Sequence, residues 1–152
     1  MWFDHVKWLH VLAAIVAVGA NLTYAIWIAR ASREPGVLPF VLHTIPVIDR
    51  RVANPCYAAL LVTGLIMAFL LPVPFSTPWL LTALVLYVLA ALLGILAYAP
   101  VARRQRLILE TQGFEHPSYN EIARKSNRLG MVVTIDVLVI VYLMVVRPAL
   151  WG

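Results

Sequence analysis

Residues 8–29 read WLHVLAAIVAVGANLTYAIWIA, a run without a single charged side chain. The hydrocarbon core of a bilayer is about 30 Å thick, and roughly 20 apolar residues in a helix cross it. Three further apolar runs of similar length follow at residues 52–71, 79–99 and 129–146. Because backbone polar groups in hydrocarbon must be satisfied within their own segment, these runs are predicted as helices and not as strands.

The four runs predict an all-α fold: a polytopic, antiparallel bundle of four transmembrane helices that forms a single domain over residues 1–152. The composition agrees, since 62% of the residues are apolar and 12% are charged. A soluble fold of this size needs many more charges to cover its surface. With one cysteine, Cys56, the chain forms no internal disulfide and offers no cysteine cluster to a metal.

The basic residues predict the orientation of the bundle. Most of the 12 Lys and Arg residues flank or lie in the first and third connections, and only Lys7 and Arg147 fall on the other side. Connections rich in Lys and Arg remain on the cytoplasmic side of the membrane. Both termini are therefore expected on the exterior or periplasmic side. The net charge of +5 is then explained by topology and lipid headgroups, and nucleic acid is not expected as a partner. We expect a multi-pass protein of the bacterial inner membrane.

The connections carry their own signals. Residues 35–49 are apolar but contain three prolines, so we expect an interfacial stretch that lies on the cytoplasmic leaflet. Residues 72–78 are short and uncharged, which predicts a tight antiparallel hairpin of the second and third helices. Ser118 and Glu121 have the spacing of a capping box, so a helix is expected to begin there and to continue into the fourth span.

Polar side chains inside the spans are costly in lipid and therefore informative. His10 lies near the exterior end of the first span, and helical spacing places Ala14, Ala17, Asn21 and Tyr24 on its stripe. One imidazole followed by two small side chains leaves a slot beside the ring. We expect a flat ligand to fit there, with His10, Ala14 and Ala17 in contact with it.

Two methionines lie at a similar depth to His10. Met67 and Met144 are each about a turn from the exterior ends of the second and fourth spans. One imidazole and two thioethers suit haem with His and Met axial ligands, or a copper(I) site. The alternative is that the methionines fill the core or face lipid and that His10 bonds a neighbouring hydroxyl.

Asp136 is the acidic residue well inside a span, at nearly the depth of Asn21. An ionised carboxylate there is costly, so we expect it to be protonated, open to water, or paired with Asn21, Tyr24 or Thr134. The functional interpretation is a proton relay. The alternative is a buried hydrogen bond that joins the first and fourth helices.

Residues 7–16, KWLHVLAAIV, followed by Val18-Gly19, resemble the opening of an uncharacterised integral membrane family, domain of unknown function 2269. The resemblance extends over nearly the whole chain. It is carried further by Arg50-Arg51, Thr63-Gly64, Arg103-Arg104, Arg124, Arg128, Asp136 and the closing residues 144–148, MVVRP.

That family is similar to the copper resistance D membrane proteins and the HemJ-type protoporphyrinogen oxidases, which open with a comparable Lys-x-x-His helix. In the HemJ type this histidine is implicated in binding haem b, so the resemblance implies that role for His10. This chain departs from both in having Ala17-Val18-Gly19-Ala20 where they usually have a Trp and paired glycines.

Three functions follow as hypotheses. The first is a haem b protein with a redox or haem-related role, in which His10 is an axial ligand and Asp136 moves protons. The second is a non-enzymatic accessory subunit of a larger membrane complex. Besides the lipid bilayer, the expected partners are a second copy of the chain in a homo-oligomer or such a larger complex. The third is copper handling by His10, Met67 and Met144. The sequence contains no phosphate-binding loop, nucleophile elbow or zinc-binding histidine pair, and it assigns no enzyme class.

Overall fold

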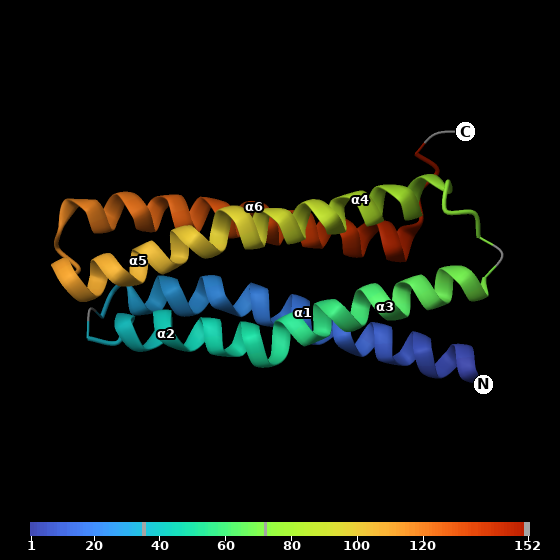
Figure 1. Cartoon of the computed structure of the whole chain (residues 1–152), viewed down its shortest axis with the longest axis horizontal. Helices are drawn as coiled ribbons and strands as arrows, with labels where there is room; N and C mark the ends of the chain where they lie inside the picture. The colour runs from blue at the N-terminus through green and yellow to red at the C-terminus, as the bar shows by residue number, and fades with distance from the viewer. Residues whose placement is uncertain (35, 72, 151–152) are drawn as a thin grey trace.

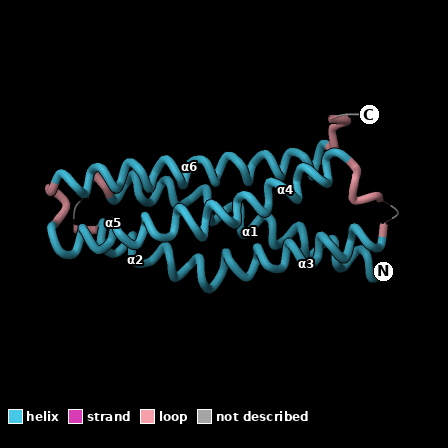
Figure 2. The backbone as a smooth tube through the Cα atoms, turned by 45° about the horizontal axis from the view of Figure 1, so that its top comes forward, coloured by secondary structure: helices cyan, strands magenta, loops and turns pink. Residues whose placement is uncertain are grey.

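Four helical rods run antiparallel along one axis in the computed structural model, which describes residues 1–34, 36–71 and 73–150 (Figure 1). Each rod is long and apolar enough to span a membrane. Those residues contain no strand, and Figure 2 shows their loops gathered at the two ends of the bundle. The predicted all-α, four-span fold is confirmed. The rods consist of α1 (Trp2–Ala31); α2 (Leu38–Ile48), η1 (Asp49–Ala53) and α3 (Asn54–Leu70); α4 (Pro78–Leu92), η2 (Leu93–Tyr98) and α5 (Ala99–Gln112); and α6 (Pro117–Val146).

The two ends of the bundle differ in their charge. We call the end where α1 and α4 begin and α3 and α6 end the terminal end, and the end where α1 and α5 end and α2 and α6 begin the arginine-rich end. The third and fourth rods continue well past the predicted spans at the arginine-rich end, because α5 ends at Gln112 and α6 begins at Pro117. Pro35 and Pro72, where two predicted connections begin, lie outside the described residues.

The rods associate as two pairs, which form two layers in Figure 1. In the first pair α1 packs along α2 and α3, and in the second pair α6 packs along α4 and α5. The pairs meet through α1 with α6 and through α2 with α5, whereas the described backbones of α3 and α4 stay apart. The predicted tight hairpin of the second and third spans is therefore wrong. Helix α3 uses its small-residue face, which includes Gly64, against α1 instead.

The second and third rods each contain a π-helical turn, and a proline follows two residues after its end. The N–H of Asn54 bonds the carbonyl of Asp49, and the N–H of Ala99 bonds the carbonyl of Gly94, each five residues back. Pro55 and Pro100 follow, and a proline supplies no N–H to the carbonyl four residues before it. The wider turn accommodates the proline ring, and the second rod bends where α2 meets α3 (Figure 1).

The main hydrophobic core lies at the arginine-rich end. Its buried members are Tyr24, Ala31, Leu38, Val41, Leu42, Ile45, Ile108, Tyr119 and Ile122. Four of them belong to α2, so residues 38–48 form a bundle helix, and the predicted interfacial stretch is corrected. Pro39 is tolerated because it lies in the first turn of α2, where an N–H has no helical partner.

Helix α6 runs without interruption from Pro117 to Val146, which confirms the predicted continuity through Gly130. Its first turn is capped by His116, whose Nδ1 accepts a hydrogen bond from the N–H of Ser118 at 3.2 Å. The capping residue is therefore His116 and not Ser118, although the helix begins where the sequence predicted.

Candidate functional site

His10 faces the interface between α1 and α3. Its side chain is half-buried, and its Nδ1 lies 2.8 Å from the hydroxyl oxygen of Thr63. The Thr63 hydroxyl also lies 2.6 Å from the carbonyl oxygen of Ala59, one turn earlier in α3. The three groups form a chain of hydrogen bonds that ends on the α3 backbone.

This chain determines which ring nitrogen of His10 carries the proton. A hydroxyl has one hydrogen to donate, and Thr63 donates it to the carbonyl of Ala59. The Nδ1 of His10 must therefore donate to the Thr63 oxygen. In the neutral imidazole this leaves Nε2 with a free lone pair, and among the described residues it has no hydrogen-bond partner.

Gly64 makes room for the ring. A Cβ atom built at Gly64 would lie 3.2 Å from Cε1 of His10 and 3.8 Å from Nδ1, so any side chain there would push against the imidazole. Thr63 and Gly64 together form the seat of His10: one residue bonds the ring and the next leaves space for it. The sequence singled out this dipeptide only through the family resemblance.

The rest of the predicted stripe has other partners. Ala17 is fully buried and Ala14 is half-buried. Because Ala17 is enclosed by protein, the predicted slot is closed at that residue. Asn21 donates a hydrogen bond to the hydroxyl of Tyr57 on α3, and the buried hydroxyl of Tyr24 has no hydrogen-bond partner among the described residues.

The two methionines lie on different pairs of rods. Met67 is half-buried on α3, one turn beyond Thr63 toward the terminal end. Met144 is half-buried in the last turn of α6, the rod that packs along α4. Over the described ranges, no group of three or more His, Cys, Asp or Glu side chains is placed to hold a metal ion.

Asp136 is not joined to the partners that the sequence suggested. One of its carboxylate oxygens is buried and makes no hydrogen bond to any described residue. Asn21 bonds Tyr57 instead, and the Thr134 hydroxyl donates to the carbonyl of Gly130 at 2.9 Å. The predicted bond between the first and fourth helices through Asp136 is absent from this arrangement.

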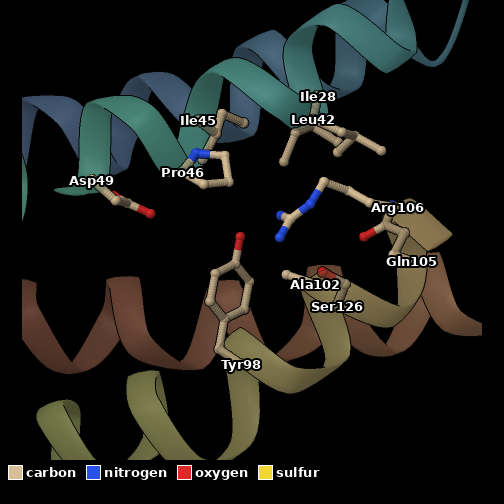
Figure 3. A pocket seen from close by; sticks show the side chains of 10 residues that line it. All are labelled: Ile28, Leu42, Ile45, Pro46, Asp49, Tyr98, Ala102, Gln105, Arg106 and Ser126. Carbon is tan, nitrogen blue, oxygen red and sulfur yellow. The ribbon is translucent and has the colours of Figure 1, made fainter. Parts of the chain in front are cut away.

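A second polar region lies between the two pairs, beside both π-helical turns. It encloses a cavity of about 30 Å³. In Figure 3 the carboxylate of Asp49, the hydroxyl of Tyr98 and the guanidinium of Arg106 all point toward its centre. The lining residues are Ile28, Leu42, Ile45, Pro46, Asp49, Tyr98, Ala102, Gln105, Arg106 and Ser126. The sequence did not indicate this region, because Asp49 was assigned to an interfacial segment.

Exposed arginines surround the bundle at the level of this cavity. Each of them lies within a few residues of a lining residue in the sequence, and together they come from three of the four rods. They are Arg50, Arg51, Arg103, Arg104, Arg124 and Arg128. Arginine side chains at such a level reach lipid phosphates. We infer that the hydrocarbon ends near this belt and that the cavity lies at headgroup depth.

Comparison with known proteins adds the family. A family model described as a predicted integral membrane protein (DUF2269) matches residues 4–148, which include His10, Thr63, Asp49 and Asp136. Searches of the curated proteins and of the solved structures find no match.

Proposed function

The chain belongs to the DUF2269 family of predicted integral membrane proteins, and on that premise we propose that it holds a redox metal centre, with haem b as the first candidate, through Nε2 of His10. The observation that supports this proposal is the hydrogen-bond chain from His10 through Thr63 to Ala59, which also contains the bond to a neighbouring hydroxyl that the alternative predicted. Histidines that ligate metals almost always donate their other ring N–H to a protein oxygen, which fixes the tautomer and the ring orientation.

The residues around His10 fit an axial imidazole. The ring is half-buried on the face of α1 that is turned to α3, and Nε2 makes no hydrogen bond to a side chain of the described residues. Gly64 leaves the ring the space that it needs. Ala17 is too enclosed to contact a cofactor in this arrangement, so it is not proposed as a contact.

Haem b bound here would supply one-electron redox chemistry. The residues of this chain would orient the imidazole: Thr63 accepts its Nδ1 proton, and the Ala59 carbonyl holds the Thr63 hydroxyl in place. Removal of such an outer partner typically lowers metal affinity about 10- to 100-fold.

The absorbance spectrum of the protein purified from haem-supplemented cells tests the proposal. We expect a Soret band that is lost in His10→Ala and weakened in Thr63→Val, each checked for folding by size-exclusion chromatography. His5→Ala is the matched control, because His5 lies on the same helix, is exposed and bonds only the Met1 carbonyl. A colourless wild-type protein, or an unchanged band in His10→Ala, would overturn the proposal.

Copper handling is the second candidate, and the position of Met67 favours it. The Met67 thioether, one turn from Thr63 on the helix that bonds His10, is a soft ligand of the kind that copper(I) prefers. Titration with copper(I) under reducing conditions separates the two candidates. Tight binding that is lost in both His10→Ala and Met67→Leu, without any Soret band, supports copper.

The accessory-subunit alternative draws no specific support from a single surface. Only 6% of the most apolar stretch of the third rod is buried within the chain. Its exposed valines and leucines suit contact with lipid as well as with a partner protein.

A further inference from the structure

Asp49 occupies an unusual position at the junction of the two pairs of rods. It is the first residue of η1, and its carboxylate points into the cavity toward Tyr98 and Arg106 of the other pair (Figure 3). From its own pair, the Tyr24 side chain on α1 interacts with it. The acidic side chain of Asp49 thus lies among two phenols and one guanidinium, which come from the first and third rods.

None of these groups neutralises Asp49 by direct contact. Within the described ranges the ion pairs join the N-terminus to Asp4 and His43 to Glu110, so no side-chain nitrogen of Arg106 lies within 4.0 Å of a carboxylate oxygen of Asp49. The Tyr24 hydroxyl is buried and unpartnered, with a residue exposure of 8%. Arg106 therefore lies across the cavity from the carboxylate without an ion pair to it.

The space between these groups is the size of a water molecule. A cavity needs a volume of roughly 10–15 Å³ and two to four polar partners to hold a water molecule. The cavity here has about 30 Å³, and Asp49, Tyr98, Arg106, Gln105 and Ser126 contribute polar groups to its wall. In addition, Pro46 has no N–H for the carbonyl of Leu42, and both residues line the cavity.

We propose that Asp49 is a proton-binding site, served by water in this cavity at the level of the arginine belt. Uptake converts the carboxylate and a hydronium ion into a carboxylic acid and a water molecule, and release reverses this step without moving electrons. The ionised form is stabilised by the phenol hydroxyls and, through water, by Arg106. The neutral form loses the attraction to Arg106, so proton binding weakens a link between the two pairs.

The site is independent of the metal centre proposed at His10. It lies between the π-helical turns near the arginine-rich end, whereas His10 and Thr63 lie within the first pair, toward the terminal end. A failure of one proposal leaves the other standing.

Infrared spectroscopy of the full-length protein in lipid films tests the proposal directly. We expect a carboxylic-acid C=O band that grows as the pH is lowered, is lost in Asp49→Asn, and persists in Asp136→Asn, the matched control. Tyr24→Phe and Tyr98→Phe should shift the frequency of this band, because each removes a hydroxyl that faces the carboxyl group.

Water access has its own test on the same samples. Exchange into D₂O should shift the Asp49 band rapidly in the wild type and several-fold more slowly in Ala102→Leu, whose larger side chain would fill the cavity. The proposal is overturned if no band titrates in the wild type, or if the titrating band is unchanged in Asp49→Asn. It is also overturned if the Asp49 band does not exchange.

Discussion

The hydroxyl of Tyr87 on α4 lies 2.8 Å from the backbone carbonyl oxygen of Tyr57 on α3 and donates a hydrogen bond to it. This bond connects two rods whose backbones stay apart. The Tyr57 hydroxyl in turn accepts a hydrogen bond from Asn21 on α1. Three rods from both pairs are therefore linked through the backbone and side chain of one tyrosine.

Tyr87→Phe should destabilise the bundle by about 0.5–1.5 kcal/mol, the usual net contribution of one hydrogen bond. The substitution keeps the ring and removes only the donor. Thermal unfolding in detergent measures the effect, and Tyr142→Phe serves as the control because Tyr142 is exposed. Equal stability of the two variants would contradict a role for the Tyr87 bond in holding the pairs together.

Gly64→Ala should lower stability or displace the His10 ring, because its new Cβ would lie 3.2 Å from Cε1 of His10. Gly19→Ala adds the same methyl group to α1 where nothing lies within 4 Å. Alanine is favoured over glycine in helices by about 0.8–1.0 kcal/mol, so the control should be neutral or stabilised. Thermal unfolding of both variants in the same detergent measures the difference. Similar shifts of the unfolding temperature in both would argue against a close contact between Gly64 and the His10 ring.

Ile122→Ala should lower the free energy of unfolding by about 2–5 kcal/mol, because Ile122 belongs to the core at the arginine-rich end. Met131→Ala in the same helix should change the free energy of unfolding little, since Met131 is 64% exposed. Unfolding of both variants in the same detergent provides the measurement. A large loss in Met131→Ala with none in Ile122→Ala would mean that the core is placed wrongly.

His43 and Glu110 join α2 to α5 through a contact of 2.8 Å between Nε2 and Oε1. Both side chains are about half exposed, so a double-mutant cycle with His43→Ala and Glu110→Ala should give a coupling of only about 0.2–1 kcal/mol. At a pH where the His43 imidazole is protonated, the coupling should fall as salt is added, because exposed ion pairs are screened. A coupling that is insensitive to salt would indicate that the two residues interact by packing.

The number and position of the spans followed from the sequence because uninterrupted apolar length is a strong signal. The inward position of His10 also followed, since a half-buried imidazole lies on the stripe that helical spacing predicted. Pairing of the rods did not follow. Loop length suggested that α3 packs on α4, but the small residues Ala17 and Gly64 bring α1 and α3 together instead.

The polar partners were harder to predict, because they depend on the angular position of each rod. Asn21 and Asp136 have similar predicted depths within their spans. Asn21 nevertheless bonds Tyr57, and the buried oxygen of Asp136 has no hydrogen-bond partner among the described residues. The region around Asp49 was missed for a related reason. Its components come from segments that were assigned to an interface or to separate spans, and only the three-dimensional arrangement brings them together.

The paired π-helical turns also bear on how the sequences of this family should be compared. A π-helical turn is equivalent to a one-residue insertion in an α-helix, and it rotates everything beyond it by about 100°. A relative with a one-residue gap opposite 49–53 or 93–98 has a straight rod at that point. Its cavity would be lined by side chains one register away from Asp49 or Tyr98, however similar the flanking residues are.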